Sequence, residues 1–151
     1  MEFLYEALVL SFLTNGGNRF CCPQYSIKHT DGKPDWRCPD FVVLDFDESR
    51  VIVAEVTTAW DIKRLAKKTV ELHDQGIPRI REQFKSESFA KIAEWPIRLQ
   101  LFVREDRKAA LEKELAGHVD KRNFEVIALE QVFQRWKWAD MPPMEVCLTT
   151  T

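Results

Sequence analysis

The sequence has few glycines and lacks the short motifs of several common enzyme classes. None of its five glycines lies in a Gly-rich phosphate loop, and no serine or cysteine nucleophile motif is present. It also has no internal repeat, low-complexity segment or linker. These absences argue against a P-loop or triad enzyme, and they predict a single domain over residues 1–151.

A long apolar run is also missing. The longest one near the N-terminus, "ALVLSFL", is much shorter than a bilayer span, and Glu2 and Glu6 precede it instead of Lys or Arg. The sequence therefore predicts neither a signal peptide nor a transmembrane helix. We expect a cytoplasmic protein without a membrane partner.

Cysteine is present at four positions, but no CxxC spacing or disulfide framework links them. Reduced thiols are the favoured interpretation. The alternative is a zinc site formed by Cys21, Cys22, His29 and Cys38.

No charge of one sign dominates, since the net charge is −2, which argues against a protein that coats nucleic acid by bulk electrostatics. The charges are nevertheless unevenly distributed. Residues 60–92 carry eight Lys or Arg against five Asp or Glu, whereas the rest of the chain is net acidic.

The composition, with 45% hydrophobic and 30% charged residues, is that of a soluble globular domain. Apolar periodicity and turn residues predict the secondary structure. The predicted helices are 2–14, 58–75, a second stretch that follows a break at Gly76–Pro78 and runs to about 92, 106–117 and a short one holding Trp136 and Trp138. The predicted strands are approximately 24–28, 40–46, 51–57, 97–103 and 124–129. This order, αβββα(α)βαβα, predicts an α/β (α+β) fold with a mixed central sheet flanked by helices.

Two carboxylates lie at the outer ends of the apolar strands 40–46 and 51–57. A turn at "DESR", residues 47–50, would place Val42 opposite Glu55 and Asp40 opposite Thr57. Asp40 and Glu55 would then share one face, diagonal to each other at roughly 7–8 Å. Any even-length turn centred between Glu48 and Ser49 keeps them together, whereas an odd turn or a bulge separates them.

Two carboxylates at this spacing can hold a divalent cation such as Mg²⁺, which binds one or two carboxylates and keeps several waters. The ion would activate water for attack on a phosphate ester. The alternative is structural, with Asp40 capping the turn after Pro39 and Glu55 solvated at a sheet edge.

The hairpin resembles the PD-(D/E)XK nuclease superfamily through Pro39-Asp40 at the start of one strand and Glu55-Val56-Thr57 on the next. The element order from the first helix to the strand at 97–103 is similar as well. The resemblance implies a restriction-endonuclease-like αβββαβ core and a Mg²⁺ or Mn²⁺ ion held by Asp40, Glu55 and the Val56 carbonyl. It also implies a further ligand from the first helix, Glu6 first and Glu2 second.

The chain departs from that pattern at Thr57, where the family usually has lysine. Threonine supplies no positive charge to orient water or to stabilise the transition state. Lys63 and Lys67, on the next predicted helix, are the candidates to replace it. The alternative is that both lie on the solvated face of an amphipathic helix.

The excess of Lys and Arg in residues 60–92 predicts a surface that can bind along a nucleic-acid phosphate backbone. Its candidate residues are Lys63, Arg64, Lys67, Lys68, Arg79 and Arg81. Trp36 and Trp60 are candidates for stacking on substrate bases.

The leading hypothesis is a Mg²⁺- or Mn²⁺-dependent nuclease that cleaves DNA, as an endonuclease sooner than an exonuclease. The resemblance also implies a homodimer or a place in a larger complex. The second hypothesis is a catalytically inactive nuclease-like module that binds nucleic acid or protein. The third is an unrelated α/β domain whose carboxylates are incidental.

Overall fold

The computed structural model describes residues 2–15, 17–29 and 35–135. Their helices are α1 (Glu2–Thr14), α2 (Ile62–Glu71), the π-helix η1 (Leu72–Gly76), α3 (Ile77–Ser86), α4 (Ala90–Ala93), α5 (Glu105–Ala116) and α6 (Leu129–Arg135). The strands are β1 (Arg19–Pro23), β2 (Phe41–Asp45), β3 (Arg50–Val56), β4 (Ile97–Val103) and β5 (Phe124–Ala128). The predicted order of helices and strands is confirmed.

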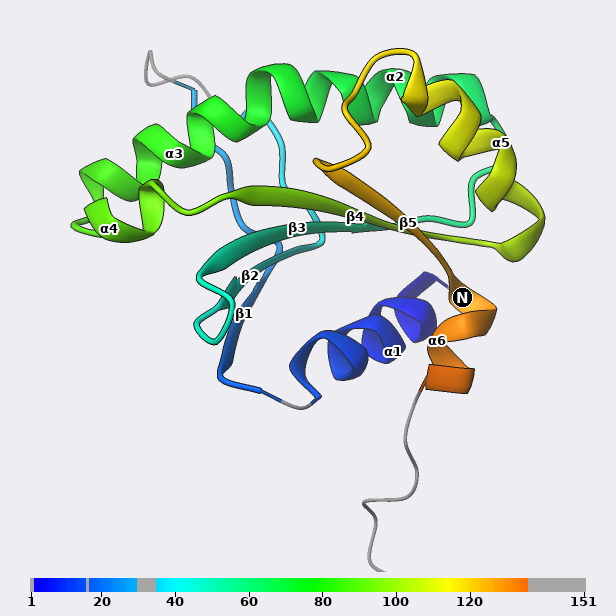
Figure 1. The fold of residues 1–151 in the computed structure, drawn as a ribbon, viewed down its shortest axis with the longest axis horizontal. Coiled ribbons are helices and arrows are strands. Elements are labelled where there is room, and N and C mark those ends of the chain that lie inside the picture. The colour runs from blue at the N-terminus through cyan, green and yellow to red at the C-terminus, as the bar shows by residue number, and fades with distance from the viewer. Residues whose placement is uncertain (1, 16, 30–34, 136–151) are drawn as a thin grey trace, which may run out of the picture.

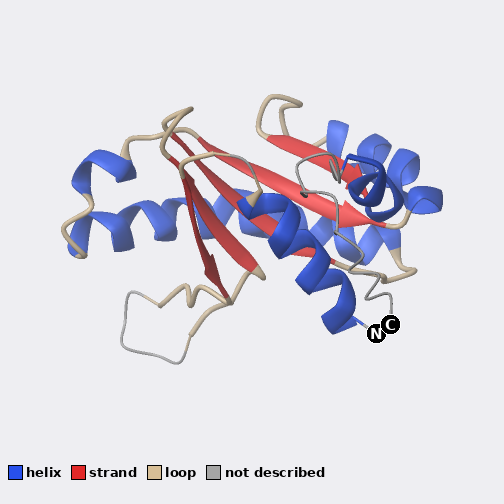
Figure 2. Ribbon diagram, turned by 90° about the horizontal axis from the view of Figure 1, so that it is seen from below, coloured by secondary structure: helices blue, strands red, loops and turns tan. Residues whose placement is uncertain are grey.

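The five strands form one mixed sheet in the order β1-β2-β3-β4-β5. β1, β2 and β3 pair antiparallel, whereas β3, β4 and β5 pair parallel. Helices α2 to α5 cover one face of the sheet, and α1 and α6 cover the other (Figures 1 and 2). The fold is therefore a three-layer arrangement of helices, sheet and helices.

Each face of the sheet has its own apolar core, because alternate residues of a strand point to opposite faces. Val53 and Leu101 belong to the core beneath α2 to α5, and Ile52 and Phe102 belong to the core against α1 and α6. β4 is consequently buried on both faces apart from Arg98, so its second face is covered by helices instead of solvent.

The predicted break at Gly76–Pro78 is wrong. The helix continues from α2 into α3 through η1, where the N–H of Ile77 bonds to the carbonyl of Leu72 five residues earlier. Pro78 lies in the first turn of α3, directly after the wider turn of η1. Gly76 fits closely, since a Cβ there would lie 2.6 Å from Leu72 Cδ1 and 3.0 Å from Trp36 Cζ3.

The strand predicted at 24–28 is also misplaced. β1 is Arg19–Pro23, and Ile27 forms only an isolated bridge with Arg37. The chain turns at Gln24, which has a positive φ of 49°, and this turn ends β1. Trp136 and Trp138 of the predicted C-terminal helix lie outside the described residues.

The predicted register of the central hairpin is wrong by two residues. Asp45 pairs with Arg50 and Val42 with Val53, so the four-residue turn is 46–49 instead of 47–50. Because the turn still has an even length, the residues that share each face are unchanged. Within the described residues, no helix is long and apolar enough to cross a membrane.

Asp45 explains where the turn forms. Its carboxylate is buried and forms ion pairs with Arg19 (3.0 Å) and Arg50 (3.2 Å), and it accepts the Glu48 N–H at 3.2 Å. Burial by itself would raise the pKa of the Asp45 carboxyl group, but the Glu48 N–H and the two arginines outweigh it, and the pKa is lowered. This arrangement ties the turn to both of its strands and to β1.

Replacing Asp45 with alanine should lower the free energy of unfolding by about 2–3 kcal/mol, because it leaves two part-buried guanidinium groups without their partner. Chemical denaturation at neutral pH measures this loss. The loss should shrink as the pH falls from the ordinary Asp value of 3.8 through the lower pKa of the folded protein, because the unfolded chain takes up this proton first. Glu48→Ala, at an exposed position of the same turn, is the control and should change stability little. Equal effects of the two substitutions would contradict the assignment.

Candidate functional site

Asp40 and Glu55 meet at the edge of the sheet where β3 ends. The pairing of Phe41 with Ala54 continues by one residue to place Asp40 directly opposite Glu55, instead of opposite Thr57 as predicted. Directly opposite residues lie closer than the predicted diagonal pair. The two carboxylates line one pocket, on the face of the sheet that α2 covers.

The ladder between β2 and β3 ends here because of Pro39. The N–H groups of Val51 and Thr57 bond toward β4, so the alternate residue Val56 directs its N–H and carbonyl toward β2. Pro39 lies at the position that would pair with Val56, but it has no N–H to donate to the Val56 carbonyl. The Val56 N–H instead donates to Asp40 Oδ2 at 2.6 Å. Asp40 and the Val56 backbone are thereby held against each other.

The pocket at this edge has a volume of about 240 Å³. Its lining residues are Glu6, Arg37, Asp40, Glu55, Val56, Thr57, Leu65, Lys68 and Thr69. The structure thus brings together Asp40, Glu55, Val56, Thr57 and Glu6 of the predicted site. The side chain of Glu2 is outside the described residues.

Arg37 is the residue that the sequence interpretation missed. Its Nη2 lies 2.8 Å from Glu55 Oε1, and its Nη1 donates to the Lys68 carbonyl at 2.8 Å. Trp36, next to it, donates its backbone N–H to the Ile27 carbonyl, and the centroid of its ring lies 5.4 Å from the guanidinium carbon of Arg79. These contacts hold the loop before Pro39 against the helix α2–η1–α3. An arginine three residues before Asp40 was visible in the sequence, but the path of the loop was not.

The Glu55 carboxyl group has an unusually high pKa. Its pKa is raised to about 7, chiefly by burial and also by the Asp40 charge, although Arg37 and Lys68 act in the opposite direction. Its side chain is 17% exposed, so desolvation is only partly relieved by water. The charged form of Glu55 is therefore destabilised in the folded protein, because Arg37 and Lys68 do not fully offset its desolvation.

The lysines of α2 point to two different sides of that helix. Lys68 lines the carboxylate pocket, whereas Lys63 and Lys67 line a separate hollow of about 640 Å³ between α2 and α5. The structure therefore does not bring the two predicted substitutes for the motif lysine to the site. The hydroxyl of Thr57 accepts the Ala59 N–H at 3.0 Å and so stabilises the turn after β3.

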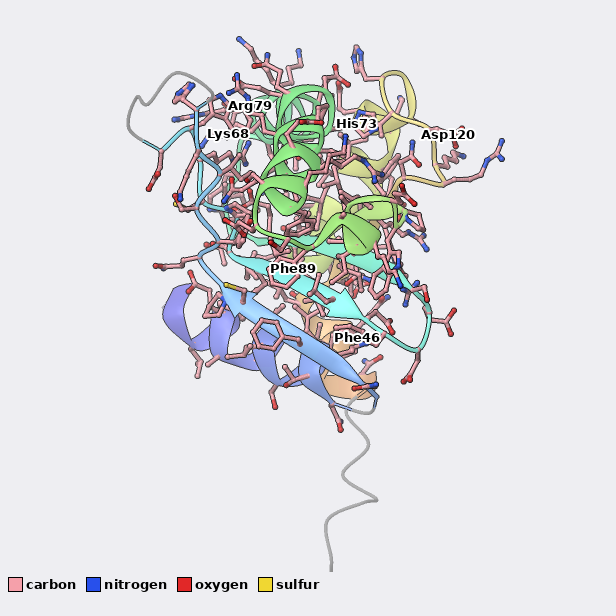
Figure 3. The ribbon with its side chains drawn as sticks, turned by 90° about the vertical axis from the view of Figure 1, so that its left-hand side faces the viewer. Phe46, Lys68, His73, Arg79, Phe89 and Asp120 are labelled. Atoms are coloured by element: carbon pink, nitrogen blue, oxygen red, sulfur yellow. The ribbon has the colours of Figure 1, made fainter. Side chains whose placement is uncertain are left out.

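The other predicted nucleic-acid contacts differ in how available they are. Arg64 is exposed on α2, as are the three lysines of that helix. Arg79 packs over Trp36, and Figure 3 shows it on the same side of the helical layer as Lys68. Arg81 donates from one nitrogen to the carbonyls of Ala93 and Trp95, so it ties α3 to the end of α4.

A metal ion at this site would have few protein ligands. In the part of the chain that the structure describes, no group of three or more His, Cys, Asp and Glu side chains is placed to hold a metal ion. Glu6 therefore shares the pocket with the two carboxylates without completing such a group. The alternative zinc site is not supported either, since Cys21, Cys22, His29 and Cys38 are all described and are not gathered.

Comparison of the chain with protein-family models and with curated proteins finds no match. The function of the pocket therefore has to be inferred from its own residues.

The raised pKa of Glu55 leads us to expect that the stability of the metal-free protein depends on pH. The folded state holds the Glu55 proton up to about pH 7, whereas the unfolded state loses it near the ordinary value of 4.5. Folding thus takes up a proton in this range, and stability should fall as the pH rises through it. Relative to Glu55→Gln, the wild type should lose about 3 kcal/mol of unfolding free energy between pH 4.5 and pH 7.

Urea denaturation in EDTA at several pH values measures this difference. Glu112→Gln, which removes a carboxylate from the exposed surface of α5, is the control and should run parallel to the wild type. If Glu55→Gln also runs parallel to the wild type, the buried carboxylate does not titrate as inferred.

Proposed function

We propose that this chain is a metal-dependent nuclease that hydrolyses phosphodiester bonds of DNA. The proposal depends on one observation above all: Asp40, Glu55 and the Val56 backbone converge in one pocket bordered by Lys68. The pocket lies at the carboxyl end of β3, beside its parallel neighbour β4, where α/β sheets commonly bind their ligands.

The topology supports the nuclease interpretation. α1, the antiparallel strands β1 to β3, the helix α2 and the parallel strand β4 follow the αβββαβ order that the PD-(D/E)XK resemblance implies. We accordingly propose a restriction-endonuclease-like core, to which α5, β5 and α6 are added.

The residues present suit a hard divalent cation. Asp40 and Glu55 provide carboxylate oxygens, and the Val56 carbonyl has no N–H partner at Pro39, which matches the oxygen ligands that Mg²⁺ and Mn²⁺ take. Arg37 would have to release or share Glu55 when such an ion binds. When bound, the ion would activate a water and offset charge on the phosphodiester.

Lys68 is the residue that we propose supplies the positive charge absent at Thr57. Its carbonyl already accepts Arg37, and its charge lowers the pKa of Glu55, so it acts electrostatically on the pocket. A lysine in this place would hold a phosphate oxygen above the two carboxylates. The exposed Lys63, Arg64 and Lys67 would attract the DNA backbone at longer range.

A second candidate function is a catalytically inactive module that binds nucleic acid. The observation that favours it is the ion pair between Arg37 and Glu55, which places a fixed cation beside the carboxylate that would otherwise bind metal. Calorimetry with Mn²⁺ separates the two candidates. Binding that Asp40→Asn and Glu55→Gln abolish supports the nuclease, and absent binding with retained DNA affinity supports the inactive module.

Cleavage of single-stranded, duplex and branched DNA with Mg²⁺ or Mn²⁺ tests the proposed function directly. Asp40→Asn and Glu55→Gln should each lower the rate by about 100-fold or more, because each removes a proposed metal ligand from the reaction centre. Activity that survives both substitutions would belong to another site or to a contaminating nuclease, and would refute the proposal.

Lys68 can be tested against matched lysines on the same helix. Lys68→Ala should reduce the cleavage rate by roughly 100-fold through the loss of transition-state stabilisation. Lys63→Ala and Lys67→Ala remove the same chemistry from the far side of α2 and should mainly weaken the salt-dependent binding of DNA. Equal rate losses at all three positions would show that Lys68 has no special role.

A further inference from the structure

Trp60 is exposed to an extent that its packing does not explain. The residue lies in the loop between β3 and α2, three positions after Thr57, and 66% of its surface is accessible to solvent. Tryptophan is usually well buried, because its large apolar ring gains much from burial. An indole left open beside the proposed site therefore needs another reason.

Two arginines lie against this ring. The guanidinium carbon of Arg107 is 4.0 Å from the ring centroid, and that of Arg104 is 5.5 Å away. Asp106 forms ion pairs with both, at 3.8 Å to Arg104 and 3.6 Å to Arg107. The cations are thus held in place against Trp60, while most of the indole surface remains open.

This cluster, Trp60 with Arg104 and Arg107, lies at the same edge of the sheet as the carboxylates. β3 and β4 are parallel, with Val56 paired to Phe102, so the chain leaves both strands at one edge. Trp60 follows β3, and the arginines begin α5 directly after β4. The loop after β3 and the start of α5 are neighbours at one end of the sheet (Figure 1).

We infer that this cluster binds an unpaired nucleotide, so that the substrate of the neighbouring pocket is DNA with a single-stranded segment. An open indole supported by guanidinium groups offers a flat surface on which a base can stack. In a duplex both faces of each base are already stacked, so only an unpaired or flipped base can use the ring. The substrate class rests on the proposed nuclease function, whereas the stacking itself does not.

The surrounding charges determine how this binding would respond to salt. Asp61 lies next to Trp60 before α2, and Glu105 and Asp106 lie beside the arginines at the start of α5, so the cluster attracts phosphate only weakly. Stacking is therefore its main contribution to affinity. Loss of Trp60 should weaken DNA binding without changing its salt dependence, because that dependence reflects how many phosphates the basic residues elsewhere neutralise.

Fluorescence anisotropy with labelled single-stranded and duplex DNA of one sequence, in EDTA so that nothing is cleaved, tests this inference. Trp60→Ala should weaken binding of the single strand roughly 5- to 100-fold and leave duplex binding unchanged. Trp60→Phe should restore part of the affinity, because a smaller ring still stacks. The slope of affinity against salt concentration should stay that of the wild type.

Phe46→Ala is the matched control. Phe46 is also an exposed aromatic residue, with 43% of its surface accessible, but it lies at the β2–β3 turn, at the opposite end of β3 from the site. Its substitution should leave binding of both DNA forms unchanged. The inference is overturned if the wild type binds no single-stranded DNA, if Trp60→Ala binds it normally, or if duplex binding falls equally.

A cleavage assay with Mn²⁺ on the same DNA separates this inference from the proposed function. If DNA is cleaved but Trp60→Ala binds and cleaves single strands normally, stacking on Trp60 is wrong and the nuclease stands. If single strands bind through Trp60 but are never cleaved, the nuclease is wrong and the stacking site stands. Asp40→Asn should keep Trp60-dependent binding while it loses cleavage.

Discussion

The antiparallel pairing of β2 with β3 stops at Pro39, because proline has no N–H to extend the ladder. Its partner position, Val56, is then left beside Asp40, and the Asp40 carboxylate accepts the N–H that the ladder would have used. On its other edge β3 continues in parallel register with β4. The same strand end is therefore rigid on one side and open to a ligand on the other.

The faces of the hairpin could be predicted from sequence, but its register could not. Alternation of apolar residues along β2 and β3 depends only on whether the turn has an even length, so Asp40 and Glu55 fell on one face. The exact register depends on Asp45, whose burial between Arg19 and Arg50 favours the turn at 46–49. Arg19 and Asp45 are 26 residues apart in the sequence, so a local sequence pattern does not reveal their contact.

The bounds of the apolar helix α1 and of the strand β4 were predicted accurately. β1 was not, because a short edge strand is defined by pairing with β2 instead of by its own alternation. Which lysine of α2 lines the pocket was not visible in the sequence for a related reason. The rotation of α2 about its axis is set by packing on the sheet and on α5, and this rotation turns Lys68, not Lys63 or Lys67, to the pocket.

Arg37 also bears on how the protein folds. Two carboxylates placed opposite each other repel, and a site that relied on metal to neutralise them would fold only as the metal bound, as small zinc domains do. Here the guanidinium is a counter-ion carried by the chain itself, and it joins the loop before Pro39 to β3 and α2. The domain can therefore complete its fold without a cation in the pocket, and under the proposed function a metal ion would not have to supply stability.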